Sequence, residues 1–194
     1  MKLKICGLTS HTDIDYVNQA RVDYAGFVFA SGHRQEISKN MALAFKKQLD
    51  PKIMAVGVFV DEPLSLILDI VNSGCIDAVQ LHGKAEYPLP VPTLRGMVMR
   101  DKSDILATAC DYVIFDGHWN GAVGSSGGSF DWRLIADYQD KPFFLAGGIH
   151  INNIYQAFTF KPYGIDISSG VEENGKKSLV KILEVSHACK NHSN

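Results

Sequence analysis

The sequence has no large excess of either charge, no long apolar run and no closely spaced pair of cysteines. Its 19 Lys and Arg residues against 21 Asp and Glu residues give a net charge of −2. This balance argues against an obligate nucleic-acid binder, because such proteins carry a basic patch or stripe. No stretch approaches the ~18 apolar residues of a membrane span, and the N-terminal apolar stretch is shorter than the ~7–15 residues of a signal peptide. We therefore expect neither nucleic-acid nor membrane partners.

None of the four cysteines lies in a C-x-x-C pair, so we expect neither a zinc site nor a redox dithiol. Since nothing indicates secretion, free thiols in a reducing cytoplasm are expected. Apolar residues make up 46% of the chain and charged residues 21%, an ordinary globular mixture. A chain of 194 residues can bury a core of its own. We expect one domain over residues 1–194, with two small domains as the alternative.

Eight short apolar runs bounded by Gly, Asp or charged residues are typical of buried parallel strands. They lie at 2–6, 24–30, 54–60, 77–81, 94–98, 112–116, 142–146 and 164–168. Amphipathic stretches that predict helices lie at 12–21, 38–49, 62–73, 131–139, 150–159 and 177–190. The segment 84–93 contains three prolines and cannot hold a long regular helix.

This alternation predicts an α/β fold, a compact closed (β/α)8 TIM barrel with a degenerate fourth helix. Such barrels typically have ~250 residues, so this shorter chain has little room for inserted lids or domains. The alternative is an open doubly wound sheet. That fold would place a G-x-G-x-x-G turn after the first strand, where the sequence has Cys6-Gly7-Leu8-Thr9 instead.

Functional residues of a barrel gather at the carboxyl ends of its strands. Polar, small or reactive residues follow the apolar runs at these points: Cys6-Gly7, 31–34, 80–83, Asp116, 124–131, Gly147-Gly148 and 168–170.

Seven segments, taken together and in order, carry a resemblance to a known family. They are KICGLT at 4–9, GFVFASGHR at 26–34, VGVFV at 56–60, VQLHG at 79–83, FDW at 130–132, LAGGI at 145–149 and DISSGVE at 166–172. The chain resembles the phosphoribosylanthranilate isomerase family of L-tryptophan biosynthesis. The resemblance implies a compact barrel that converts N-(5-phosphoribosyl)anthranilate, a phosphorylated small molecule, into an aminoketose by an Amadori rearrangement. It implies no metal and no organic cofactor.

The implied reaction needs one acid, which protonates the ribose ring oxygen, and one base, which removes a proton from the carbon beside the anomeric carbon. The resemblance assigns Cys6 as the base and Asp131 as the acid. From the residues alone, Cys6 could equally be a small core residue and Asp131 a helix N-cap. Asp116, at the end of the sixth predicted strand, is a second candidate acid.

Three further residues are candidates for substrate binding. The resemblance implies that Arg34 binds the anthranilate carboxylate, a planar anion that suits a guanidinium group; otherwise Arg34 is a solvated loop residue. Gln80 and His82 alternate with apolar neighbours, so both can point inward and line the pocket. We expect no metal ligand at His82, because no second ligand stands at a useful spacing.

Gly147, Gly148, Ser169 and Gly170 follow the seventh and eighth predicted strands. Barrels often bind phosphate at this place through backbone N–H groups, and glycine allows the backbone to approach the anion closely. We therefore predict a phosphate site here, with ordinary turns as the alternative.

Side-chain alternation gives a structural prediction for the barrel interior. We take Lys4 and Cys6 to point inward, so that Leu3 and Ile5 meet the helices. A closed barrel places the first strand beside the last, and a buried charge is costly without a partner. We therefore predict an ion pair between Lys4 and Asp166.

Two other functions remain alternatives. One is a related phosphosugar enzyme, such as an indole-glycerol-phosphate synthase, which would need a catalytic lysine and glutamate and a longer N-terminus. The other is a barrel that binds a phosphorylated metabolite without catalysis, which loss of Cys6 or Asp131 would have indicated. The ordinary surface composition predicts a monomer.

Overall fold

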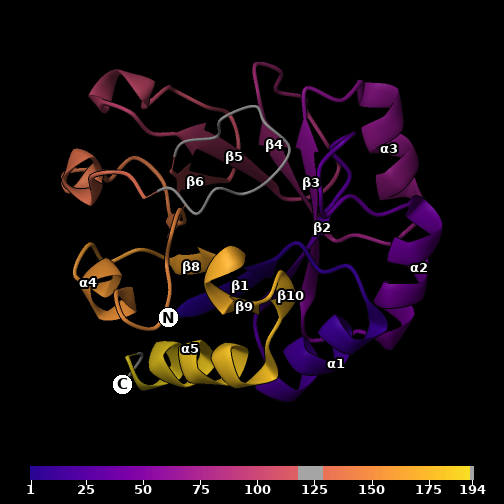
Figure 1. The fold of residues 1–194 in the computed structure, drawn as a ribbon. Helices are drawn as coiled ribbons and strands as arrows, with labels where there is room; N and C mark the ends of the chain where they lie inside the picture. Colours follow the sequence, from indigo (N-terminus) through magenta and orange to yellow (C-terminus); the bar gives the residue numbers. More distant parts are fainter. Residues whose placement is uncertain (118–128, 193–194) are drawn as a thin grey trace.

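The computed structural model, which describes residues 1–117 and 129–192, is a closed barrel of eight parallel strands in sequence order (Figure 1). β1 pairs with both β2 and β8, which closes the barrel. The predicted (β/α)8 TIM barrel is therefore confirmed. The strands are β1 Lys2–Cys6, β2 Tyr24–Val28, β3 Met54–Val60, β4 Ala78–His82, β5 Thr93–Val98, β6 Tyr112–Asp116, β7 Phe143–Leu145 and β8 Gly164–Ile167.

Five α-helices lie in the described parts of the chain, each within a predicted region or close to it. They are α1 His11–Ala20, α2 Lys39–Gln48, α3 Leu64–Asn72, α4 Ile154–Phe158 and α5 Leu179–Asn191. Two of them are capped by a serine side chain: the Ser10 hydroxyl accepts from the N–H of Asp13, and the Ser38 hydroxyl accepts from the N–H of Met41. These side chains satisfy backbone donors that the first turn of a helix leaves without partners.

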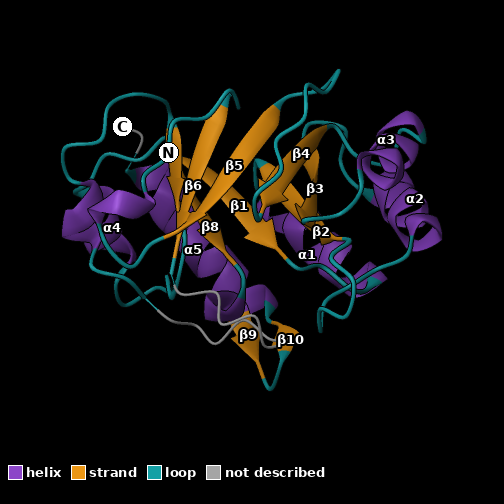
Figure 2. Ribbon diagram, turned by 90° about the horizontal axis from the view of Figure 1, so that it is seen from above, coloured by secondary structure: helices purple, strands orange, loops and turns teal. Residues whose placement is uncertain are grey.

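Helices α2 and α3 lie beside β2, β3 and β4 (Figure 2), whereas the connections that follow β4 and β5 contain no α-helix. Between β4 and β5 there is no helix, as the prolines predict. Arg95 of β5 holds this connection to the barrel by donating to the carbonyl oxygens of Gly83 and Ala85. The connection from β5 to β6 contains only a 3₁₀ turn, η1 (Lys102–Asp104).

The prediction of a helix at 131–139 is wrong. The chain forms a single 3₁₀ turn there, η2 (Trp132–Ile135). Its two buried side chains, Trp132 and Ile135, are three residues apart, which is the repeat of a 3₁₀ turn. Of the predicted loop at 124–131, residues 124–128 lie outside the described residues.

The apolar core has two main layers, one between strands and helices and one inside the barrel. Successive side chains of each strand point alternately into these layers. Leu3 and Ile5 pack outward in the layer between strands and helices, as predicted. Lys4, on the opposite face of β1, is fully buried inside the barrel. The closed interior is filled by Tyr24, Val56, Ala78, Leu94, Ile114, Phe144 and Ala146.

A short hairpin follows β8 and was not predicted. After the 3₁₀ turn η3 (Ser169–Val171), β9 (Glu172–Glu173) pairs antiparallel with β10 (Lys176–Lys177). Asn174 and Gly175 form the two-residue turn with φ of 51° and 75°, the left-handed geometry that tight hairpins need. No helix in the described chain is long and apolar enough to cross a membrane.

Candidate active site

Cys6 is the last residue of β1, and its sulfur points into the barrel. Its thiol is free, and it packs beside the small apolar cluster of Val28, Ala30 and Val58. A Cβ on Gly26 of β2 would lie 2.7 Å from the Cys6 sulfur, so the absence of a side chain at Gly26 gives the thiol its space. Burial raises the pKa of this thiol, so the protein without substrate favours the protonated form.

Lys4 and Asp166 form the predicted ion pair beneath Cys6. The Lys4 Nζ lies 2.7 Å from Oδ2 of Asp166, and the two side chains are 0% and 8% exposed. Burial opposes the charge on Lys4, but Asp166 and Cys6 outweigh it, so the pKa of Lys4 lies above its ordinary value. Oδ1 of Asp166 is buried and has no hydrogen-bond partner in the described chain. Below the thiol there are therefore two opposite charges that nearly cancel.

Gln80 and His82 both lie inside the barrel, as their alternation predicts. They are buried, and Nε2 of Gln80 lies 2.6 Å from Nε2 of His82. The His82 ring lies against Gly96 of β5, where a Cβ would collide with it. Burial lowers the pKa of His82 to about 4, and the charges of Lys4 and Arg95 add to this effect. His82 is therefore a neutral imidazole near pH 7.

Asp116 ends β6 inside the same end of the barrel. Burial raises the pKa of its carboxyl group to about 7, and the negative charge of Asp166 contributes in the same direction. Near neutral pH this carboxyl group is therefore half protonated. Asp116 also lies next to Gly147, because a Cβ on Gly147 would come 3.1 Å from Oδ1 of Asp116.

Asp131 lies at the surface, with its side chain 46% exposed. It is the N-cap of η2, since its carboxylate accepts from the N–H of Arg133. The Arg133 guanidinium also donates to both carboxylate oxygens, at 2.7–3.0 Å. These hydrogen bonds hold the pKa of Asp131 below its ordinary value, so the protein without substrate carries it as a carboxylate.

Arg34 belongs to a cluster of polar side chains around one carboxylate, that of Glu172. Arg34 donates to both Glu172 oxygens at 2.9–3.0 Å, and Gln35 and Lys177 donate to Oε1 at 2.8 and 2.9 Å. Lys177 also donates to the carbonyl oxygen of Ser168 at 3.0 Å. The cluster joins the loop after β2 to the β9–β10 hairpin at the ends of β1 and β8.

The two predicted phosphate turns lie against each other. Gly147 and Gly148 have φ of 80° and 67°, which favours glycine at both positions. A Cβ on Gly170 would collide with the carbonyl oxygen of Ile149, so the turn after β8 touches the turn after β7. Ser169 begins η3, whose first N–H groups have no partner within the turn. The turns therefore have the backbone geometry of an anion site.

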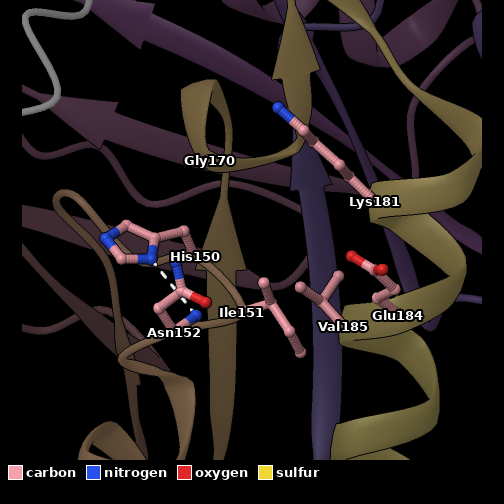
Figure 3. Close-up of a pocket in the computed structure, with 7 residues that line it drawn as sticks. All are labelled: His150, Ile151, Asn152, Gly170, Lys181, Glu184 and Val185. Atoms are coloured by element: carbon pink, nitrogen blue, oxygen red, sulfur yellow. Dashed lines mark hydrogen bonds between the residues drawn. The ribbon is translucent and has the colours of Figure 1, made fainter.

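A cavity of about 260 Å³ borders Gly170 on the side of α5 (Figure 3). Its walls come from the loop after β7, the turn after β8 and helix α5. The lining residues are His150, Ile151, Asn152, Gly170, Lys181, Glu184 and Val185. Neither Cys6 nor Asp131 lines this cavity, so it is separate from both candidate catalytic residues.

Sequence reasoning missed Gln35, Glu172 and Lys177 as site residues. The segment Glu-Glu-Asn-Gly-Lys-Lys at 172–177 carried a signal, because Asn-Gly between two short polar runs favours a two-residue hairpin turn. That hairpin places Lys177 opposite Glu172. In the described parts of the chain, no three His, Cys, Asp or Glu side chains are grouped so that they could hold a metal ion.

A closed barrel with a thiol, carboxyl groups and glycine turns at the carboxyl ends of its strands has the architecture of an enzyme of the (β/α)8 barrel class. A family model described as N-(5'phosphoribosyl)anthranilate (PRA) isomerase matches residues 3–188. The N-(5'-phosphoribosyl)anthranilate isomerase of Endomicrobium trichonymphae is 41% identical over 192 residues, which cover 94% of this chain and 95% of that protein. The corresponding isomerase of Lacticaseibacillus casei is 40% identical, with 94% and 91% covered. The chain therefore belongs to the N-(5'-phosphoribosyl)anthranilate isomerase family.

Solved structures agree with this assignment. The crystal structure of phosphoribosyl anthranilate isomerase from Thermus thermophilus aligns with a TM-score of 0.86 at 26% identity, covering 98% of this chain and 99% of that chain. A second isomerase structure, in complex with reduced 1-(O-carboxyphenylamino)-1-deoxyribulose 5-phosphate, aligns with a TM-score of 0.81 at 27% identity over the same shares. The predicted family is confirmed, and the chain is an intramolecular isomerase of L-tryptophan biosynthesis.

Proposed function

We propose that the chain converts N-(5-phosphoribosyl)anthranilate into 1-(2-carboxyphenylamino)-1-deoxyribulose 5-phosphate with Cys6 as base and Asp131 as acid. The acid gives a proton to the ribose ring oxygen. The bond from that oxygen to the anomeric carbon breaks while the nitrogen lone pair forms a C=N bond. The base then removes the proton from the neighbouring carbon, and the electron pair left behind neutralises the iminium nitrogen as an enolamine. Tautomerisation of the enolamine gives the ketone.

The position of Cys6 carries this proposal. Its thiol ends β1 inside the barrel, beside Gly26 and above the Lys4–Asp166 pair. Thiolates are effective bases, and substrate bound at this end of the barrel would meet the sulfur directly.

Asp131 must exchange its bonds to Arg133 for the substrate before it can act as an acid, because its carboxylate is ionised in the free protein. Asp116 is the second candidate acid. A carboxyl group whose pKa lies at about 7 holds a transferable proton at neutral pH. Asp131 keeps the assignment because the family motif FDW contains it.

Two groups of residues are proposed to bind the substrate, one at its anthranilate carboxylate and one at its phosphate. Arg34 would take the anthranilate carboxylate and share its guanidinium with Glu172. Gly147, Gly148, Ser169 and Gly170 would hold the phosphate through backbone N–H groups, while Gln80 and His82 line the pocket between.

Loss of substrate fluorescence on adding the protein tests the activity, and three variants test the roles. We expect Cys6→Ser to lose at least ~100-fold in kcat, because a hydroxyl is a far poorer base, and Asp131→Asn to lose a similar factor. Asp116→Asn is the comparison variant. If it loses the larger factor and Asp131→Asn keeps normal turnover, Asp116 is the acid. Near-normal turnover of Cys6→Ser would show that another residue is the base.

We propose that the chain acts as a monomer in the cytoplasm. Four of the six exposed large apolar side chains of the described residues come from separate segments (Met41, Leu66, Leu106 and Tyr155), and only Val180 and Leu183 share an element, helix α5. The free thiols of Cys6, Cys75 and Cys110 suit a reducing compartment. Light scattering at the concentration of the activity assay tests the oligomeric state, and a mass of twice 21.3 kDa would contradict the proposal.

A further inference from the structure

The β9–β10 hairpin inserts one of its two cross-strand pairs into the catalytic end of the barrel. The side chains of Lys177 and Glu172, which face each other, are 2% and 9% exposed. The outer pair, Lys176 and Glu173, lies in solvent. A buried lysine is costly, so its placement calls for a reason beyond the stability of a six-residue hairpin.

The ammonium group of Lys177 lies at the join of β1 and β8, where Cys6 ends its strand. Its Nζ donates to the carbonyl oxygen of Ser168 at 3.0 Å and contacts the Ser168 hydroxyl at 3.4 Å. The register between β1 and β8 pairs Ile5 with Ile167, and the next residues along the chain are Cys6, which ends β1, and Ser168, which follows β8. The ammonium group of Lys177 and the thiol of Cys6 therefore lie at the same end of the β1–β8 pair, where both strands finish.

The charges around Cys6 make Lys177 different from Lys4. Lys4 has a carboxylate of its own, Asp166, at 2.7 Å, so that pair is neutral overall. Glu172, by contrast, is shared by two cations, because both Arg34 and Lys177 donate to it. One carboxylate cannot cancel both charges, so Lys177 has no carboxylate of its own. The ionisable groups facing Cys6 or Lys177 are Lys4 from β1, Asp166 from β8, Glu172 from β9, Asp13 from α1 and Arg34 from the loop after β2.

We propose that Lys177 is a positioning residue whose ammonium group stabilises the thiolate of Cys6 when the thiol has lost its proton. Ser168 and Glu172 fix the ammonium group in place for this role. The direction of the electrostatic effect agrees: burial dominates and raises the pKa of Cys6, whereas the charges of Lys4 and, more weakly, Lys177 lower it. The inference deepens the proposed function, since it rests on Cys6 being the base, but it concerns the ionisation of a thiol and can be measured without turnover.

The test is the pH dependence of Cys6 alkylation by iodoacetamide, followed on the Cys6 peptide by mass spectrometry. An opposite charge nearby typically lowers a pKa by about one unit or more. We therefore expect Lys177→Met to move the midpoint about one pH unit upward, with alkylation about tenfold slower below the midpoint. Lys177→Arg should restore the wild-type midpoint, because the charge returns. Lys176→Met, on the same hairpin but in solvent, should leave the midpoint unchanged.

Circular dichroism first establishes that each variant is folded. Should Lys177→Met not fold, Lys177→Gln replaces it, because its amide can still donate to Ser168 and Glu172 while the charge is gone. A folded Met or Gln variant with the wild-type midpoint would overturn the inference. An upward shift in a protein that lacks isomerase activity would instead overturn the proposed function and leave the Lys177 inference standing.

Discussion

Replacing Asp116 by Asn should stabilise the protein, and more strongly as the pH rises. The side chain ends β6 inside the barrel, and burial raises the pKa of its carboxyl group from the ordinary value of 3.8 to about 7. In the unfolded chain the group is ionised above pH 4, whereas the folded protein keeps it neutral up to about pH 7. The folded state therefore binds the extra proton between these values, and its stability falls as the pH rises through this window.

The magnitude follows from the two pKa values. At about 1.36 kcal/mol per pH unit, the penalty reaches about 4 kcal/mol above pH 8 and is about 1.5 kcal/mol at pH 5. Asn keeps an oxygen for the N–H of Gly117 but carries no charge. The gain in unfolding free energy from Asp116→Asn should therefore be about 2–3 kcal/mol larger at pH 8 than at pH 5. His82, whose pKa is lowered to about 4, changes stability in the opposite direction, but it is common to both proteins and cancels.

Urea unfolding followed by circular dichroism at pH 5 and pH 8 measures this difference. Asp137→Asn is the control, because it removes a carboxylate whose side chain is 89% exposed. Its effect should be small at both pH values. If the effect of Asp116→Asn is the same at both pH values within about 0.5 kcal/mol, the buried carboxyl group is not neutral in the folded protein and the reasoning fails.

Three further predictions concern binding and the barrel interior. Arg34→Ala should raise KM more than it lowers kcat, by the loss of a charge-assisted contact of ~1.5–3 kcal/mol, and steady-state kinetics with an unchanged KM would contradict this. Inorganic phosphate should compete with substrate, because the Gly147–Gly148 and Ser169–Gly170 turns are proposed to hold the phosphate; initial rates unaffected by high phosphate would place the anion elsewhere. Lys4→Met should destabilise the fold by ~3–5 kcal/mol in urea unfolding, because it leaves Asp166 buried without its cation, and Lys4→Met combined with Asp166→Leu should recover part of the loss. If Lys4→Met lowers the free energy of unfolding by less than about 1 kcal/mol, Asp166 does not depend on Lys4 as its counter-charge.

The barrel was predictable because its signals are local and repeat eight times. Each strand is a short apolar run, and the inward positions of Lys4 and Cys6 follow from alternation alone. The predicted helix at 131–139 failed because an amphipathic pattern over one or two turns fits a 3₁₀ turn as well, as Trp132 and Ile135 show. The length of the amphipathic segment, rather than the spacing of its apolar residues, distinguishes an α-helix from a 3₁₀ turn.

The candidate site was only partly predictable, since the missing information is three-dimensional. Cys6 and Asp116 could be placed by their position at strand ends, but the elevated pKa of Asp116 comes from burial in the folded barrel and, to a smaller extent, from Asp166 of another strand. Glu172 is an ordinary surface residue in the sequence, and its three partners become apparent only when the hairpin folds back on the loop after β2. No local pattern encodes such a cluster.

The closure of the barrel between β1 and β8 has a consequence during protein synthesis. The first strand leaves the ribosome early, but the partner that completes its hydrogen bonding, and the carboxylate that neutralises Lys4, lie 162 residues later. At ~5–20 residues per second, the ribosome needs about 10–30 s to supply them. Until then, β1 lacks its β8 neighbour and Lys4 lacks its anion. The final barrel can therefore form only after translation is nearly complete, and its last step joins the two ends of the chain.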